Sequence, residues 1–339
     1  MRLGNHKTFI IAEVGVNHNG SLKKALKLID IAASAGVNAI KFQTFKAENL
    51  ATDYAQKAEY QKSKSSKKET QFQMLKKLEF TDAMHKACFN KCKKKKIIFI
   101  SSAFDIESLN YLKKFKLSHF KVPSGEITNI PYLEVLGKFR KKVILSTGMS
   151  NIYEIKKAIE TLIINGTKKK NITLMQCTSA YPVPYDEINL NAIATLRNIF
   201  KLKIGFSDHS LGVQASIAAV ALGAKVIEKH LTLSKKIKGP DHRASLEPNE
   251  FKFMVQGIRI VEKALGDKEK KITKSEKKNI NIVRKSIVAS TKIKKNEKFS
   301  NYNITCKRPG TGISPLFFKN LIGKKAVKNF NKNDLIRLK

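Results

Sequence analysis

The chain has 339 residues, 42% of them hydrophobic, and a formal net charge of +39 at pH 7. This hydrophobic fraction is ordinary for a globular protein, so disorder is not the default, and no run approaches the ~20 apolar residues that a membrane-spanning helix needs. Of the 66 basic residues 58 are lysines, spread along the whole chain, so we interpret the charge as a solvated basic surface. We expect no nucleic-acid partner and no membrane partner.

Eight β-like runs alternate with helical stretches, beginning with a run at 9–17. The other strands are expected at 39–45, 97–103, 120–123, 143–146, 172–177, 203–206 and 225–230. Helices are expected from Ser21 to Gly36, from Thr81 onward, and at 105–115, 131–137, 151–164, 190–199, 214–223 and 249–265. Runs such as 97–100 are apolar without alternation, which is typical of parallel strands buried on both faces. The pattern predicts an α/β fold, a (β/α)8 TIM barrel, which needs ~250 residues.

The remaining segments indicate a second domain and a long loop. The polar segment 46–79 is too long for an idle loop and is interpreted as a lid or substrate loop. The catalytic barrel is expected over 1–266, a lysine-rich linker over 267–281, and a small β-rich domain over 282–339.

The four cysteines form no complete zinc motif. Cys88 and Cys92 lie four apart on a predicted helix, and Cys177 and Cys306 lie in apolar runs. We expect free core thiols in a reducing compartment. Because the N-terminal residues enter a strand pattern at once, without a signal-peptide layout, we expect a cytoplasmic protein.

Two histidines, His209 and His230, stand at the ends of the seventh and eighth strands. Neighbouring strands lie ~4.8 Å apart, so the two imidazoles can share a divalent metal ion such as Mn²⁺ or Mg²⁺. Asp208, Glu228 and Asp241 lie near them in the sequence and are candidate companions. The alternative is that each histidine is a hydrogen-bonded structural residue.

Lysines and serines at the ends of other strands suggest an anion site. Lys41 and Lys121 each lie between apolar residues, so they are expected to face the barrel mouth, where a lysine can bind phosphate or form a Schiff base. Serines at nearby strand ends complete the predicted cradle: Ser101, Ser102, Ser124 and Ser146. Glu13 and Glu126 are candidate acid/base groups, although Glu126 can equally be a carboxylate at a helix start.

Several motifs together resemble the sialic acid synthase family. They lie at 11–20, 39–44, 121–126, 145–149, 205–209, 228–230 and 239–242. The segment 307–315 resembles the antifreeze-like (SAF) domain that follows the barrel in this family. The resemblance runs through essentially the whole chain, and the order of its motifs is highly specific.

The resemblance implies condensation of phosphoenolpyruvate with an N-acetylated hexose, either N-acetylmannosamine or a 2,4-diacetamido relative. The products are a nine-carbon 2-keto sugar acid and phosphate. By the family pattern, His209 and His230 hold the metal, Mn²⁺ first, with Mg²⁺ or Co²⁺ as alternatives. Positions that bind phosphoenolpyruvate are Lys41, Lys121, Ser102, Ser124 and Ser146. Positions near the sugar are Glu13, Gln43, Tyr181 and Asp241, and Glu126 matches the residue that handles protons on the attacking water.

Two further residues carry implications from the resemblance. Arg308 matches an arginine that reaches the partner subunit's active site and contacts the N-acetyl group, which implies a domain-swapped homodimer. Ser179 stands where some members of the family have Asn, and its shorter side chain leaves room for a different sugar substituent.

Three alternatives remain open from the residues alone. A metal-independent barrel aldolase would form a Schiff base on Lys41 or Lys121. A nucleic-acid-binding protein would need a focused basic patch with aromatic residues. The C-terminal domain could also be a dimer clamp only, in which case Arg308 would not affect activity.

Overall fold

A computed structural model describes residues 7–57 and 69–338 of the chain. The chain divides into two compact units, Met1–Asp267 and Lys268–Lys339. Each unit has its own hydrophobic core. The predicted linker 267–281 falls at the start of the second unit and contains the short helix α12 (Lys274–Lys277).

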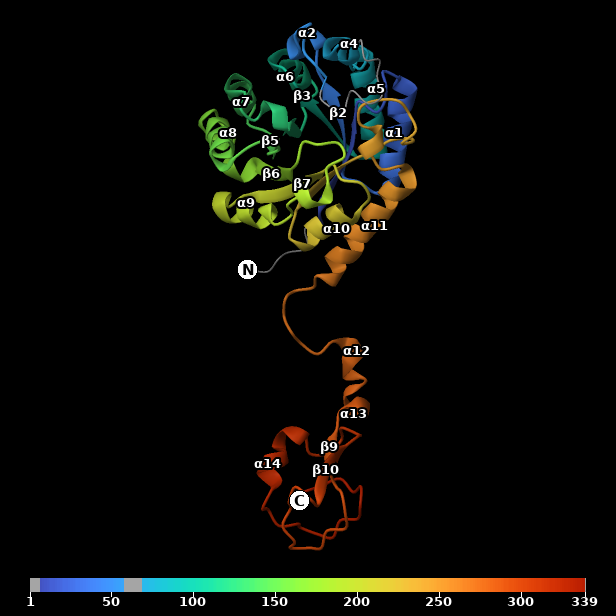
Figure 1. Ribbon diagram of the computed structural model, residues 1–339, viewed down its shortest axis with the longest axis vertical. Coiled ribbons are helices and arrows are strands. Elements are labelled where there is room, and N and C mark those ends of the chain that lie inside the picture. Colours follow the sequence, from blue (N-terminus) through green and yellow to red (C-terminus); the bar gives the residue numbers. More distant parts are fainter. Residues whose placement is uncertain (1–6, 58–68, 339) are drawn as a thin grey trace. The chain divides into compact units, whose positions relative to one another are not determined.

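Eight parallel strands close the first unit into a barrel (Figure 1). The barrel closes where β8 pairs with β1. The strands are β1 Phe9–Gly15, β2 Ala39–Thr44, β3 Ile98–Ala103, β4 His119–Val122, β5 Lys142–Ser146, β6 Ile172–Cys177, β7 Lys203–Asp208 and β8 Val226–His230. Each overlaps a run predicted from the sequence, and the predicted TIM-barrel fold is confirmed.

Helices surround the barrel, one after each strand. They are α1 Leu22–Ala35, α5 Asp82–Lys95, α6 Ile106–Lys113, α7 Ile130–Gly137, α8 Ile152–Ile164, α9 Ala192–Phe200, α10 Gln214–Ala221 and α11 Pro248–Ala264. The predicted ends of the first helix are confirmed: Ser21 accepts a hydrogen bond from Lys24 N–H, and Gly36 has φ 81°. The predicted loop 46–79 contains α2 (Ala47–Leu50) and α4 (Gln71–Lys76), whereas its residues 58–68 lie outside the described residues.

Alternation along the strands divides the barrel into a packed floor and a polar mouth. Inward residues near the strand starts form an apolar layer that includes Ile11, Ile100 and Met175. A Cβ on Gly205 would lie 2.4 Å from Met175 Sδ, so only glycine fits this layer without a shift of its neighbours. Nearer the carboxyl ends the inward residues become polar, and the site is built there.

The second unit is small and rich in turns. Its sheet pairs β9 (Ser286–Ala289) with β10 (Ile304–Lys307) in antiparallel fashion. Two more short helices, α13 (Ile280–Val283) and α14 (Phe318–Leu321), belong to it. Its core has nine buried residues, among them Ile287 and Phe330, so this unit is small even by the standards of independent domains.

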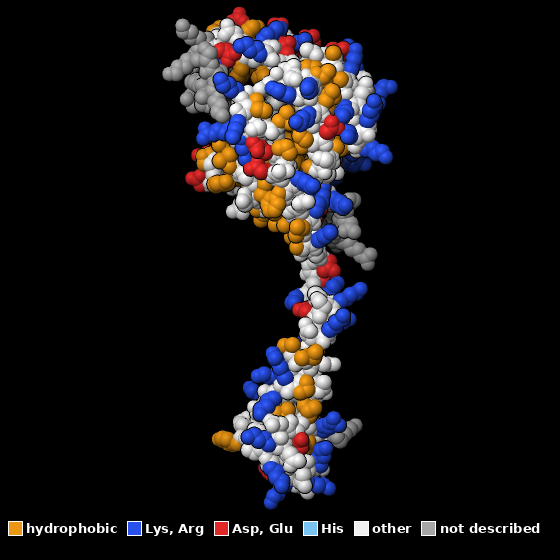
Figure 2. All heavy atoms as spheres, turned by 90° about the vertical axis from the view of Figure 1, so that its right-hand side faces the viewer, with side chains coloured by type: hydrophobic (Ala, Val, Ile, Leu, Met, Phe, Trp, Pro, Cys, Tyr) orange, Lys and Arg blue, Asp and Glu red, His pale blue; other side chains and the backbone are white. Residues whose placement is uncertain are grey.

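The distribution of surface charge and the state of the cysteines agree with what the sequence predicts. Figure 2 shows lysine and arginine side chains distributed over one face, with apolar and acidic side chains between them. Cys88, Cys92 and Cys177 are buried and Cys306 is half-buried, and all four are free, as predicted. Within 7–57 and 69–338, no helix combines the length and the apolar character needed to cross a bilayer.

Candidate active site

Two lysines and two glutamates form a buried chain of charges at the carboxyl ends of the strands. The strand register pairs Glu13 of β1 with Lys41 of β2 and with His230 of β8. Lys41 Nζ lies 2.8 Å from Glu13 Oε2 and 3.7 Å from Glu228 Oε1. Lys121 Nζ lies 3.0 Å from the same oxygen of Glu228. The structure therefore brings the two predicted lysines together around one carboxylate.

Sequence reasoning did not anticipate this role of Glu228, which it placed beside the metal. Its side chain shares a strand face with His230, two residues on, so the alternation of β8 was the available signal. Ser207, at the same height on β7, also donates a hydrogen bond to Glu228 Oε1 at 3.2 Å. Glu228 is thus the counter-charge of both lysines.

Glu13 and Glu228, the two glutamates of this chain of charges, have pKa values shifted in opposite directions. Burial, with a contribution from Glu228, raises the pKa of Glu13 to about 7 although Lys41 acts against it. Burial also favours the neutral form of Glu228, but Lys121 and Lys41 outweigh it and lower the pKa of Glu228 to about 2. Near neutral pH, Glu13 can therefore exchange a proton while Glu228 stays ionised.

Three of the four predicted cradle serines face this site. Ser102 Oγ accepts a hydrogen bond from Lys41 Nζ at 3.1 Å, and Ser124 Oγ accepts one from Gly148 N–H at 3.1 Å. Ser146 Oγ is buried without a hydrogen-bond partner in the described part of the chain. The expectation for Ser101 was wrong: it lies on the other face of β3, where its hydroxyl bonds Thr44 Oγ1 at 2.7 Å.

His209 and His230 lie together beside the charge chain. Their ring centroids are 5.5 Å apart, and the ring of Tyr181 stacks on His209 at 4.1 Å. His209 Nδ1 donates a hydrogen bond to Thr178 O at 2.8 Å, which leaves Nε2, 3.4 Å from Ser207 Oγ, as the ring nitrogen that could bind a metal. His230 Nδ1 is buried without a hydrogen-bond partner among the described residues and lies 3.8 Å from Asp241 Oδ2.

Two adjacent imidazoles could hold a divalent metal, whose other ligands would come from water or substrate. The buried Nδ1 of His230, which has no hydrogen-bond partner among the described residues, is compatible with such a site. No group of three or more His, Cys, Asp or Glu side chains in 7–57 and 69–338 is arranged to hold a metal by itself. The expectation that Asp208 accompanies His209 was wrong. Its carboxylate points to the opposite face of β7, 2.9 Å from Lys229 Nζ, and both side chains are fully buried.

A glycine lets the residues predicted near the sugar approach one another. Gly15 has φ 53° at an irregularity between β1 and β2, and a Cβ there would lie 3.0 Å from Glu13 Oε1 and 3.1 Å from Gln43 Nε2. Asp241 Oδ2 would be 3.5 Å from the same point. Burial raises the pKa of Asp241 to about 6.

Glu126 and Arg308, which the sequence predicts to be functional, make hydrogen bonds outside the chain of charges. Glu126 lies in a 3-10 turn after β4, where its Oε2 accepts a hydrogen bond from Asn129 Nδ2 at 2.7 Å, and burial raises its pKa. Arg308 belongs to the second unit, where its Nε donates to Val283 O at 2.9 Å and the side chain is exposed. The catalytic role of Glu126 and the substrate contact of Arg308 remain predictions.

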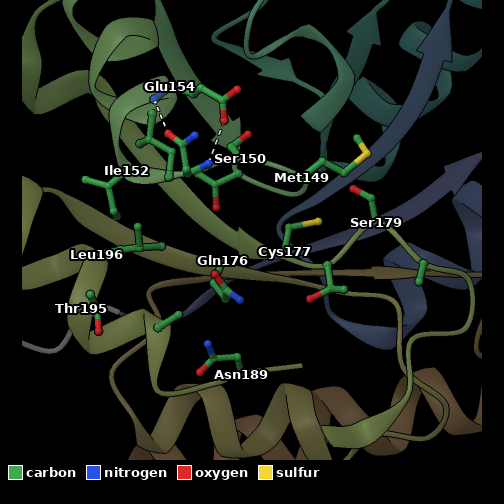
Figure 3. Close-up of a pocket in the computed structure, with 16 residues that line it drawn as sticks. Met149, Ser150, Ile152, Glu154, Gln176, Cys177, Ser179, Asn189, Thr195 and Leu196 are labelled. Carbon is green, nitrogen blue, oxygen red and sulfur yellow. Dashed lines mark hydrogen bonds between the residues drawn. The ribbon is translucent and has the colours of Figure 1, made fainter. Parts of the chain in front are cut away.

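A cavity of about 900 Å³ adjoins the site between the loops after β5 and β6 and the first turns of α8 and α9. Figure 3 shows Met149, Cys177 and Ser179 together along one part of it, and Ile152, Thr195 and Leu196 along another. Cys177 also lies 3.9 Å from His209 Nδ1, a contact that the sequence did not suggest for a core thiol. The cavity therefore begins at residues next to the histidine pair.

Comparison with known proteins places these observations in a family. The model of the NeuB family matches residues 28–270, and that of the SAF domain matches residues 284–339. N,N'-diacetyllegionaminic acid synthase of Campylobacter jejuni is 53% identical, with 98% of this chain and 99% of the relative aligned. The enzyme of the same name from Legionella pneumophila is 41% identical (95% and 91% aligned).

More distant relatives also match most of the chain. Human N-acetylneuraminate-9-phosphate synthase is 35% identical, with 98% of this chain and 92% of the relative aligned. The crystal structure of N-acetylneuraminic acid synthetase from Leptospira borgpetersenii, in complex with citrate, superposes with a TM-score of 0.72 at 34% identity. That match covers 83% of this chain and 94% of the other.

Proposed function

The chain belongs to the NeuB family of sialic-acid-type synthases and carries a SAF domain, and we propose that it condenses phosphoenolpyruvate with a 2,4-diacetamido hexose. Water is the third reactant, and the products are a nine-carbon 2-keto sugar acid and phosphate. One observation carries the proposal: two buried lysines meet at one carboxylate directly beside a histidine pair.

Phosphoenolpyruvate suits the charge chain because it carries a carboxylate and a phosphate. Lys41 and Lys121 supply the positive charge, and buried ammonium groups bind anions strongly since little water screens them. Ser102, Ser124 and Ser146 supply hydroxyl groups around the same centre. Ser146 Oγ has no hydrogen-bond partner among the described residues, and a ligand oxygen would satisfy it.

The reaction needs proton transfers at two points. When C3 of phosphoenolpyruvate bonds to the aldehyde carbon of the sugar, the aldehyde oxygen gains a proton, and Glu13 can supply it because its pKa is about 7. Water then adds to C2 and loses a proton, for which Glu126 is the candidate acceptor. Loss of phosphate from C2 leaves the ketone of the product, so the atoms of all three reactants are accounted for.

His209 and His230 are the residues that would hold a divalent metal, Mn²⁺ first. When bound, such an ion acts as a Lewis acid toward the sugar carbonyl. Two neighbouring residues hold His209 in position. Thr178 O fixes its tautomer by accepting a hydrogen bond from Nδ1, and the ring of Tyr181 stacks against its imidazole. Gln43 and Asp241, which approach Glu13 around Gly15, are the candidates to orient the sugar.

The choice of a diacetamido sugar rests on two observations. The relatives from C. jejuni and L. pneumophila, at 53% and 41% identity, are both named N,N'-diacetyllegionaminic acid synthases. A cavity of about 900 Å³ also adjoins the site at Ser179 and offers space for a second acetamido group. N-acetylmannosamine is the alternative substrate.

We also propose that the enzyme works as a domain-swapped homodimer in which Arg308 reaches the partner subunit's sugar. Arg308→Ala should then raise the KM for the sugar and leave the KM for phosphoenolpyruvate unchanged. Full activity of Arg308→Ala would leave the SAF domain as a clamp only.

Phosphate release from phosphoenolpyruvate, measured with a panel of N-acetylated hexoses, tests the proposed reaction. We expect turnover with the 2,4-diacetamido sugar, slower turnover with N-acetylmannosamine, loss of activity with chelator and its return with Mn²⁺. Borohydride trapping on Lys41 or Lys121, with activity that survives chelator, would instead establish a Schiff-base aldolase. Equal rates with both sugars would remove the specificity assigned to the cavity at Ser179.

A further inference from the structure

Six of the connections at the end of the barrel opposite the active site carry only positive charge, and Lys95 in one of them pairs with Asp30 of α1 at 2.9 Å. Six segments lead from a helix, or its last turn, into strands β3 to β8: 93–97, 113–118, 138–142, 165–171, 201–203 and 222–225. Together they contain 17 Lys and Arg residues and no Asp or Glu. All 17 of these side chains are exposed. Spread along the sequence, these lysines look scattered, but the barrel gathers them at one end.

The segments at the mouth carry charges of both signs. Five segments lead from β3 to β7 into the following helices: 104–105, 123–129, 147–151, 178–191 and 209–213. They contain four acidic residues and no Lys or Arg. The loops after β2 and β8 are mixed: residues 45–57, 69–81 and 231–247 contain eight Lys and Arg residues and six acidic residues. A uniform excess of lysine would give both ends a similar net charge. The mouth is nearly balanced, whereas the six segments at the other end have 17 basic residues and no acidic one, so composition alone does not account for the difference.

The strand register places the basic loops at a common level. Lys142 pairs with His119 and Lys203 pairs with Thr173, each at or next to the start of a strand. Lys225 precedes β8, and its N–H bonds Ile204 O at 2.7 Å. Figure 1 shows α8, α9 and α10 following one another around the barrel, so the loops after them are neighbours.

Helix dipoles explain part of this arrangement. Every barrel helix ends at this face, and lysines near a helix C-terminus are favoured by its partial negative charge, as in the last turn of α5. The effect falls off within one turn, however. Lys141, Lys142 and Lys203 lie beyond that range or within strands, so the dipoles do not account for them.

Exposed aliphatic side chains stand among the lysines on one side of this end. Ile164 at the end of α8 is 82% exposed, Ile199 in α9 is 49% exposed, and Leu222 after α10 is 42% exposed. The aromatic residues of the six segments, Phe115 and Phe139, are half-buried in the core. The surface therefore combines ammonium groups with aliphatic groups and offers no exposed aromatic ring.

Contrary to the expectation of no membrane partner drawn from the sequence alone, we propose that this surface docks on an anionic lipid bilayer. We call it the basic end and define it by Lys138, Arg140, Lys141, Lys142, Lys168, Lys169, Lys170, Lys201, Lys203 and Lys225, with Ile164, Ile199 and Leu222. Lysines attract anionic headgroups from a distance, and aliphatic side chains enter the headgroup region. A barrel docked in this way presents its mouth to the solution, where the substrates are.

A nucleic acid fits the basic end less well. Single strands are bound by exposed aromatic rings on which bases stack, and bidentate base contacts are made mainly by arginine. The basic end has one arginine, Arg140, and no exposed aromatic residue among its members.

Co-sedimentation of the full chain with lipid vesicles tests the proposal. We expect binding to phosphatidylcholine vesicles that contain phosphatidylglycerol, little binding to pure phosphatidylcholine, and release at high salt. The variant Lys168→Gln/Lys169→Gln/Lys170→Gln should partition roughly a hundredfold more weakly. Ile164→Gln should weaken binding severalfold at the same salt.

A matched variant in the second unit, Lys319→Gln/Lys324→Gln/Lys325→Gln, removes the same charge from exposed positions and should bind vesicles as the parent does. Both triple variants should release phosphate at the parental rate, which shows that they are folded. Equal partitioning onto neutral and anionic vesicles would overturn the proposal, as would equal losses in the two triple variants. So would tight binding of double-stranded RNA that the 168–170 variant abolishes while vesicles remain unbound.

Discussion

Lysines at the two ends of the barrel differ in burial: those inside the mouth are buried and paired, and those at the basic end are exposed. At the mouth, Lys41 and Lys121 are buried and each lies within 4 Å of a carboxylate. At the basic end, lysines such as Lys169 are exposed, with no acidic residue in the same segments. A buried charge must be paired and so acts locally, whereas an exposed one is solvated and acts through a summed field. Burial therefore decides whether a lysine acts on a group in direct contact with it or adds to the long-range field that attracts anions.

Removing a mouth lysine should have the largest effect. Lys41→Met leaves Glu13 without its partner at 2.8 Å and removes half of the charge proposed to bind phosphoenolpyruvate. We expect kcat/KM for phosphate release to fall by on the order of a thousandfold and the free energy of unfolding to fall by about 3 kcal/mol. Lys170→Met at the basic end is the control, and an equal loss there would erase the distinction between the two ends.

The next largest effect should come from the buried pair behind the histidines. Lys229 and Asp208 are fully buried, 2.9 Å apart, and Asp208 also accepts hydrogen bonds from Ser210 and Ser216. Lys229→Met should lower the free energy of unfolding by about 3 kcal/mol because it leaves the buried carboxylate of Asp208 without its counter-charge.

Denaturant unfolding of Lys229→Met, Asp208→Asn and the double variant gives the coupling of this pair. The double variant should lose less than the sum of the single ones. The exposed pair Lys156–Glu160, at 3.9 Å, is the comparison, and Glu160→Gln should cost less than about 0.5 kcal/mol. Additive losses at Lys229 and Asp208 would show that the two charges do not depend on each other.

Glu13 predicts a dependence of stability on pH. Burial raises its pKa from 4.5 to about 7, so between these values the folded state binds more protons than the unfolded state. The contribution of Glu13 to stability is then complete below about pH 4.5 and is lost as the pH rises through about 7. Glu13→Gln should flatten this part of the curve of unfolding free energy against pH, whereas Glu134→Gln on the surface of α7 should not.

The smallest effect on catalysis and stability is expected at the basic end. Lys168→Gln/Lys169→Gln/Lys170→Gln removes three exposed charges, and each exposed charge contributes little in water. We expect the free energy of unfolding to change by less than about 1 kcal/mol and kcat to remain unchanged. A large loss of kcat in this variant would show that the basic end influences the mouth.

The sequence predicted the barrel well because its signals are local. Each predicted strand overlaps an observed one, and β6 has the predicted bounds. The apolar runs that mark these strands, such as 97–100, must be buried whatever the connections between them. The helix starts predicted at Ser21 and Thr81 also depend only on neighbouring residues, and both are confirmed, since each side chain accepts a hydrogen bond from the first turn of its helix.

Errors arose where the sequence does not specify which way a side chain points. Ser101 and Ser102 are adjacent, yet one faces Thr44 and the other Lys41, because successive side chains on a strand alternate. Asp208 faces away from His209 for the same reason. The contact of Cys177 with His209 joins two strands, so no local pattern could reveal it.

The sequence by itself determined the elements, their order, and the residues at the strand ends, because hydrophobic periodicity and capping are short-range properties. Only the tertiary structure decided which of those residues meet. Closing β8 against β1 brought Glu228 between two lysines that lie 80 residues apart in the chain. Parallel strands require all of their return connections to run the same way, so every barrel helix ends at the end of the barrel opposite the site. Lysines that are scattered along the sequence therefore meet at that end.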